Sequence, residues 1–179
     1  MRKIAILVLI IALAAFGTSV QTHALDVLIR LYDASGAQVG TARLDYSGAG
    51  RVVVDFSVKG LPPGFHGFHV HAVGLCEPPF TSAGGHHNPA GTSHPGHAGD
   101  LPVILVNDTG VGWGKPMTTR FTTASLFDDN GSALIIHANP DNYGNIPTDR
   151  YDPDPDATTL ATGDAGPRIA CGVIAPPRS

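Results

Sequence analysis

The sequence predicts an all-β domain, a Greek-key β-barrel or sandwich of about eight antiparallel strands with two long functional loops. Short segments of alternating apolar and polar residues recur, and turn residues separate them at intervals of about 8–12 residues. Stretches with the 3.6-residue period of an amphipathic helix are almost absent. A chain of 179 residues, 42% of them hydrophobic, is long enough for one domain with a sizeable core.

The first 24 residues are typical of a secretion signal. The positive start MRK precedes the 13-residue apolar run IAILVLIIALAAF, and a cleavage site follows at Ala24. The apolar run is too short to span a bilayer comfortably, and an uncleaved membrane anchor is the alternative interpretation. We therefore expect a signal peptide at residues 1–24 and the β domain at residues 25–179, in a protein that is periplasmic or secreted.

The charge of the chain argues against polyanionic partners. Removal of Arg2 and Lys3 with the signal leaves 9 basic and 15 acidic residues, a net charge of −6. Nucleic acids and anionic membranes are bound by basic surfaces. We expect no nucleic-acid partner and no stable membrane partner. No motif specifies the oligomeric state, and a homodimer is compatible with the sequence.

The expected strands follow in order, with turns such as ASGA, GAG and DDNG between several of them. They comprise residues 25–33, 38–47, 51–60, 65–72, 101–108, 117–123, 132–138 and 168–175. The intervening residues 72–100 are rich in Gly, Pro and His, and residues 138–167 are rich in Pro, Asp and Asn. Connections of this length in a compact domain are usually functional.

The strand FHGFHVHA, residues 65–72, carries three histidines. Side chains two residues apart on a strand share a face at a spacing of roughly 7 Å. His69 and His71 therefore project side by side and can reach one ion. His66 lies three residues before His69 and is expected on the opposite face.

Further histidines are concentrated in the long segment and at the end of one strand. A single histidine on an apolar strand is more often a core residue, but so many buried imidazoles are hard to satisfy with hydrogen bonds alone. His69, His71 and His137 offer three nitrogens on strands, which suits copper, whereas His94, His97 and Asp100 suit zinc. His86 lies between the two groups in sequence and has two ring nitrogens, so it can join both metals.

The two cysteines, Cys76 and Cys171, are expected to form a disulfide because the chain is destined for an oxidising compartment. The alternative, a catalytic cysteine paired with a histidine, requires a free thiol.

Five runs of sequence, GFHGFHVH, SAGGHHNP, HAGDLP, LIIHA and GPRIACGVI, resemble the copper,zinc superoxide dismutase family, in that family's order and over residues 24–174. The resemblance implies the secreted bacterial type of this enzyme, an antioxidant defence outside the cytoplasm. It implies copper on His69, His71, His86 and His137. It also implies zinc on His86, His94, His97 and Asp100.

The same resemblance implies further roles. Asp141 would connect a copper histidine to a zinc histidine, and Arg168 would dock the superoxide anion. Two superoxide anions would be converted to dioxygen and hydrogen peroxide, with His86 released from copper on reduction and delivering a proton. His66 would be structural, and His87, for which no ligand role emerges, is expected on the surface.

Two other classes of protein are compatible with parts of the sequence. A non-enzymatic metal-binding protein, such as an exported buffer or chaperone, would explain the histidines, but loss of a copper ligand or of Arg168 would favour it and all are present. A purely structural secreted sandwich does not explain the histidines.

Overall fold

The computed structural model describes residues 27–46, 50–146 and 155–176. The strands are β1 (Val27–Tyr32), β2 (Gln38–Tyr46), β3 (Val52–Lys59), β4 (Gly64–His66), β5 (Phe68–His71), β6 (Ile104–Val106), β7 (Val111–Gly114), β8 (Met117–Thr118), β9 (Ser132–His137) and β10 (Arg168–Ile174). The helices are two 3-10 turns, η1 (Thr81–Ala83) and η2 (Thr123–Leu126), and the short α1 (Ala157–Thr162). The expected signal peptide lies outside the described residues.

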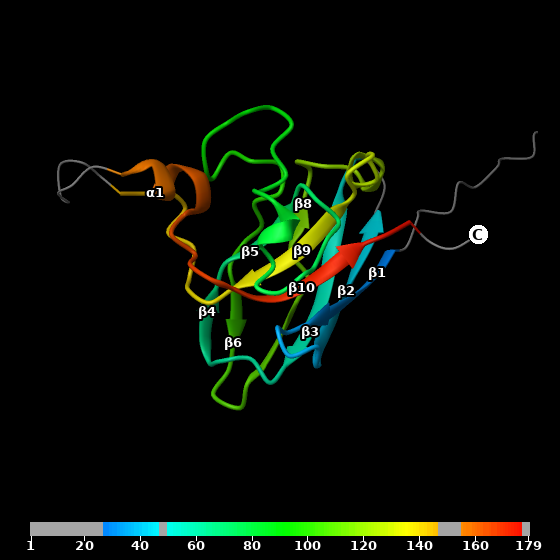
Figure 1. Ribbon diagram of the computed structural model, residues 1–179, viewed down its shortest axis with the longest axis vertical. Helices are drawn as coiled ribbons and strands as arrows, with labels where there is room; N and C mark the ends of the chain where they lie inside the picture. Colours follow the sequence, from blue (N-terminus) through cyan, green and yellow to red (C-terminus); the bar gives the residue numbers. More distant parts are fainter. Residues whose placement is uncertain (1–26, 47–49, 147–154, 177–179) are drawn as a thin grey trace, which may run out of the picture.

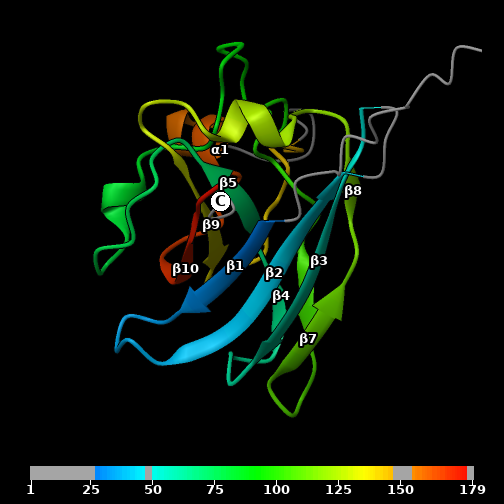
Figure 2. The ribbon, with the colours of Figure 1, turned by 90° about the vertical axis from the view of Figure 1, so that its right-hand side faces the viewer.

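The predicted antiparallel all-β class is confirmed. The main sheet has the order β5-β9-β10-β1-β2-β3-β7, β8 pairs with β3, and β4 pairs with β6 in a separate two-stranded sheet. Figures 1 and 2 show the main sheet curled into a half-barrel, with α1 and the long loops gathered at the end where β5 and β9 lie. Along the described part of the chain, no helix is long and apolar enough to cross a membrane.

The core lies on the concave side of this sheet. Strands β1 and β3 alternate between buried and exposed residues, so one face of each contributes to the core. Ile29, Leu31 and Leu44 are fully buried there. Burial of each such side chain contributes about 1.5–3 kcal/mol.

A second, smaller cluster covers the outer face of β9. All six residues of β9 are buried, because loop residues pack on the face that the core does not occupy. Phe80 from the long loop packs with Ile135 of β9 and Cys171 of β10. Strand β9, which ends at His137, is therefore packed on both of its faces.

Several predicted elements differ from those observed. The segment 65–72 is two strands, β4 and β5, in different sheets, with Gly67 between them. The predicted strand 117–123 is wrong beyond Thr118, because β8 ends there and the chain continues into η2. Both β7 and α1 were missed.

Candidate metal centre

Two neighbouring strands and one loop bring the predicted ligands together. His69 and His71 lie on β5, which pairs with β9 so that His137, the last residue of β9, lies beyond the Phe68–Ile136 pair. Loop residues 84–100 follow the other edge of β5 through isolated bridges between His71 and His86 and between His69 and Asp100.

The first cluster consists of the four histidines that were predicted to bind copper. One ring nitrogen from each can be chosen so that all lie within 4.8 Å of one another, and all four side chains are buried. They are His69, His71, His86 and His137.

Hydrogen bonds at the opposite ring nitrogens orient these imidazoles. His71 Nδ1 donates to the Gly84 carbonyl at 2.9 Å, and His137 Nδ1 donates to the Gly166 carbonyl at 2.9 Å. Their Nε2 atoms then carry no proton in the neutral rings, yet they lie only 3.4 Å apart. Two lone pairs directed at one point in this way are the arrangement that a shared cation satisfies.

The second cluster has the same compactness and includes a carboxylate. Its ligand atoms also lie within 4.8 Å of one another, and its residues are His86, His94, His97 and Asp100. Asp100 Oδ1 lies 2.8 Å from His86 Nδ1 and 3.2 Å from His97 Nδ1, and Asp100 Oδ2 lies 3.1 Å from His94 Nδ1. Three nitrogens and one carboxylate form a donor set that zinc accepts in tetrahedral geometry.

His86 belongs to both clusters and faces each with a different nitrogen. Its Nδ1 is on the side of Asp100, and its Nε2 is buried without a hydrogen-bond partner. His69 Nδ1 is likewise buried without a hydrogen-bond partner among the described residues. Buried polar atoms rarely lack a hydrogen-bond partner in folded proteins. The donor atoms fit copper on one side of His86 and zinc on the other.

Asp141 connects the two clusters from behind. Its Oδ2 lies 2.6 Å from His69 Nε2, and its Oδ1 lies 2.8 Å from His94 Nε2. The backbone N–H of Tyr143 donates to Oδ1 at 2.6 Å and fixes the carboxylate. Gly163, with a φ of +58°, is required beside it, because a Cβ there would collide with the Asp141 carboxylate.

Burial and the two carboxylates divide the histidines into two electrostatic classes. Burial lowers the pKa of His71 to about 2 and that of His137 to about 3, so both are neutral at physiological pH. Burial also lowers the pKa of His94, but the adjacent Asp100 and Asp141 outweigh this effect and raise it to about 9. Burial alone would raise the pKa of Asp100, yet interactions with His86 and His94 hold it well below its ordinary value.

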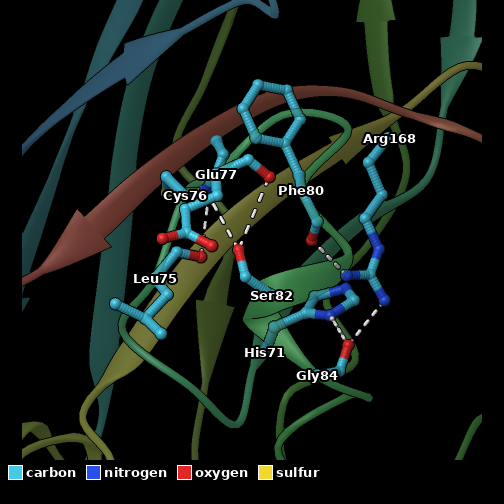
Figure 3. The surroundings of a disulfide bond; sticks show 9 residues. His71, Leu75, Cys76, Glu77, Phe80, Ser82, Gly84 and Arg168 are labelled. Atoms are coloured by element: carbon cyan, nitrogen blue, oxygen red, sulfur yellow. Dashed lines mark hydrogen bonds between the residues drawn. A yellow bond between two sulfur atoms is a disulfide. The ribbon is translucent and has the colours of Figure 1, made fainter.

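Arg168, at the start of β10, is fixed by the loop that the disulfide anchors. Figure 3 shows its guanidinium directed at the carbonyls of Phe80 and Gly84, to which Nη1 and Nη2 donate hydrogen bonds. The predicted Cys76–Cys171 disulfide is present and connects this loop to β10. The Gly84 carbonyl therefore accepts from both Arg168 and His71.

An open cavity of about 540 Å³ leads from solvent to the first cluster. It is lined by His71, His86 and His137, by Arg168, and by Thr158 and other residues of α1. Apart from the histidines, the charged side chains that line this cavity are Arg168 and Asp164, and the Asp164 carboxylate accepts hydrogen bonds from Asn142 and Thr159. Arg168 is therefore the group in this cavity that attracts a small anion.

Two histidines lie outside the clusters. His66 contacts the carbonyls of His137 and Pro62, both at 2.8 Å, so it braces the strands as a structural residue. The prediction that His87 lies on the surface is wrong, because His87 is only 6% exposed. The backbone of His87 bonds to Val70 and Gly99, which draws the residue under the loop.

Sequence reasoning missed residues that act through the backbone. The carbonyls of Gly84 and Gly166 orient His71 and His137, and no side-chain pattern reveals a carbonyl position. Gly163 could have been found as a glycine close to the predicted site, but its contact with Asp141 depends on the fold.

Comparisons with known proteins agree with this geometry. A family model described as copper/zinc superoxide dismutase (SODC) matches residues 38–174. A superoxide dismutase (Cu-Zn) of Mycolicibacterium paratuberculosis is 40% identical, over 91% of this chain and 77% of that protein. A protein of the same name from Mycobacterium tuberculosis is 41% identical, over 78% of this chain and 65% of its own length. The Cu/Zn superoxide dismutase structure from Brucella abortus is 29% identical, with a TM-score of 0.65 over 84% of this chain and 99% of that one.

Proposed function

The chain belongs to the copper/zinc superoxide dismutase family, and from that premise we propose that it converts superoxide to dioxygen and hydrogen peroxide outside the cytoplasm. The observation that carries the proposal is the position of His86 between two buried clusters, each of which supplies a complete donor set. Copper would be held by His69, His71, His86 and His137. Zinc would be held by His86, His94, His97 and Asp100.

The metals and the chain contribute differently to this reaction. When bound, copper supplies one-electron redox chemistry and zinc supplies a fixed positive charge beside it. The chain supplies rigid imidazoles, whose orientation is set by the carbonyls of Gly84 and Gly166 and by Asp141. Such partners fix the tautomer of each ring before a substrate arrives.

Arg168 would bind and orient the substrate. Superoxide carries one negative charge, and the Arg168 guanidinium is held at the wall of the cavity by two carbonyl groups. A cation fixed in this way attracts the anion without reorganisation, which is how a preorganised site stabilises developing negative charge.

His86 would deliver a proton. Two superoxide anions and two protons give one dioxygen and one hydrogen peroxide, so protons must reach the reduced oxygen. The Nδ1 of His86 is engaged on the Asp100 side, which leaves Nε2, buried without a hydrogen-bond partner, as the atom that would take and deliver a proton. Solvent entering the cavity would supply the second proton.

Export is supported by three independent features. The first 24 residues have the pattern of a signal peptide, a disulfide joins Cys76 to Cys171, and bacterial relatives share the family. We therefore assign the protein to the periplasm or the extracellular space.

Substitution of Arg168 separates an enzyme from a protein that only binds metal. Protein loaded with copper and zinc is assayed for superoxide removal as wild type, Arg168→Gln, and Arg30→Gln, a control that removes an exposed cation on β1. We expect Arg168→Gln to retain both metals but lose about 10- to 100-fold in kcat/KM, because the substrate loses its fixed counter-charge. Wild-type protein that holds both metals and does not accelerate superoxide decay would identify a metal-binding protein instead.

A further inference from the structure

The side chain of Arg120 connects the edge of the main sheet to the loop that carries two of the zinc ligands. Its Nη1 donates to the Pro95 carbonyl at 2.5 Å and lies 3.4 Å from the His97 carbonyl. Neither His94 nor His97 contacts Arg120 through its imidazole in these bonds. The contact is with the backbone from which the His97 ring projects.

Arg120 is itself fixed to the sheet. Its backbone N–H donates to Thr118 Oγ1 at 3.1 Å, and the buried Thr118 of β8 is paired with Val52 of β3. The Arg120 side chain therefore extends from a residue held by strand β8 to the backbone of the loop. A charged donor also gives a stronger hydrogen bond to a carbonyl than a neutral donor does.

The loop of residues 91–99 has little regular structure to hold its shape. It contains no strand or helix, and several of its bonds are local, such as Gly96 N–H to the Ser93 carbonyl at 2.7 Å. The loop is bonded to the rest of the fold at His94, whose N–H donates to the Leu160 carbonyl at 2.9 Å, and at Gly99, which bonds to His87 and Val70. Between these two points the backbone at Pro95 and His97 is held by local bonds and by Arg120, so loss of that tether would loosen the segment between the two anchors.

A cavity on the zinc side makes that opening consequential. This cavity, of about 390 Å³, is lined by Asp100, Pro95, Arg120 and Tyr143, and it shares no lining residue with the cavity that reaches the copper histidines. Asp100 is the proposed zinc ligand that lines this cavity, so the contact between Arg120 and Pro95 lies beside the zinc donor set.

We propose that Arg120 is a positioning residue for zinc: by bonding to the carbonyls of Pro95 and His97 it keeps the 91–99 loop closed and slows zinc release. The inference rests on the proposed function, since it takes His94, His97 and Asp100 as zinc ligands. It also separates the two metals, because nothing in the Arg120 contacts reaches His71 or His137.

The test measures metal release from the fully loaded protein. Zinc and copper transfer to an excess of chelator is followed for wild type, Arg120→Gln, Arg120→Lys and the charge-matched control Arg30→Gln. We expect zinc release to be about 5- to 10-fold faster in Arg120→Gln, with copper release unchanged. The Lys variant keeps a charged donor and should restore part of the wild-type rate.

The possible outcomes distinguish this inference from the proposed function. Zinc release from Arg120→Gln at the rate of Arg30→Gln would overturn the role of Arg120. Equal acceleration of zinc and copper release, with no rescue by Lys, would also overturn it, because Arg120 would then be a general structural residue. Wild-type protein that retains less than one zinc per chain would instead contradict the proposed function.

Discussion

The metal-free protein should lose stability steeply in mild acid, because two buried histidines resist protonation. Burial lowers the pKa of His71 to about 2 and that of His137 to about 3, from an ordinary value of 6.5. Between pH 6.5 and 4.5 both remain neutral in the folded state and become protonated on unfolding. One proton corresponds to about 1.36 kcal/mol per pH unit, so the two groups together lower the free energy of unfolding by about 5 kcal/mol over this range.

The other site residues do not reverse this trend. The pKa values of His69 and His97 are also lowered, chiefly by burial, and their contributions have the same sign. His94, whose pKa is raised to about 9, is protonated in both states below about pH 5.5 and contributes almost no slope in the lower half of the range. The pKa values of Asp100 and Asp141 are lowered despite their burial, so their stabilising effect is lost only at lower pH.

Urea unfolding of the metal-free protein at pH 4.5, 5.5 and 6.5 measures this effect. The wild-type slope should approach or exceed 2.7 kcal/mol per pH unit in the lower half of the range. In His71→Asn the slope should fall by about 1.4 kcal/mol per pH unit, whatever the variant's absolute stability. Lys59→Gln, at an exposed position on β3, is the control and should keep the wild-type slope. A wild-type slope below one proton, or an unchanged slope in His71→Asn, would refute the reasoning.

Three further predictions concern zinc, the disulfide and Gly163. Zinc binding at pH 7 should release a proton from His94, whose pKa is raised to about 9. Calorimetry in two buffers of different ionisation enthalpy would detect this proton, and equal binding heats in the two buffers would contradict the prediction. Replacing Cys76 and Cys171 with Ser should lower the free energy of unfolding by up to ~4–5 kcal/mol, because the disulfide closes a loop between cysteines 95 residues apart in the unfolded chain. An unchanged urea midpoint would be inconsistent with this loss. Gly163→Ala should cost ~2 kcal/mol and weaken zinc binding, because the new Cβ collides with Asp141; wild-type zinc affinity in a chelator competition would argue against it.

Much of the donor set could be predicted because the ligands follow sequence rules. The i, i+2 spacing of His69 and His71 requires only that β5 is a strand, and His137 stands at the end of an apolar run. The loop ligands could be identified from composition, but their convergence depends on backbone bridges to β5 that have no sequence signature.

The missed elements are those in which tertiary contacts override weak local signals. Strand β7 is only four residues long and contains two glycines, so alternation cannot be recognised in it. Helix α1 is rich in threonine and is defined by its ends, where Asp156 caps the first turn and Gly163 adopts the left-handed conformation. The surface prediction for His87 failed because its burial follows from backbone bonds to Val70 and Gly99, which have no sequence signature.

The double use of the Gly84 carbonyl has a mechanical consequence. One oxygen atom accepts hydrogen bonds from both the Arg168 guanidinium, proposed to bind the anion, and the His71 imidazole, proposed to hold copper. A thermal displacement of that peptide carries the two groups in the same direction, so their mutual spacing is conserved while their absolute position drifts. The irregular loop that carries Gly84 can therefore move slightly while the distance between Arg168 and His71 stays the same.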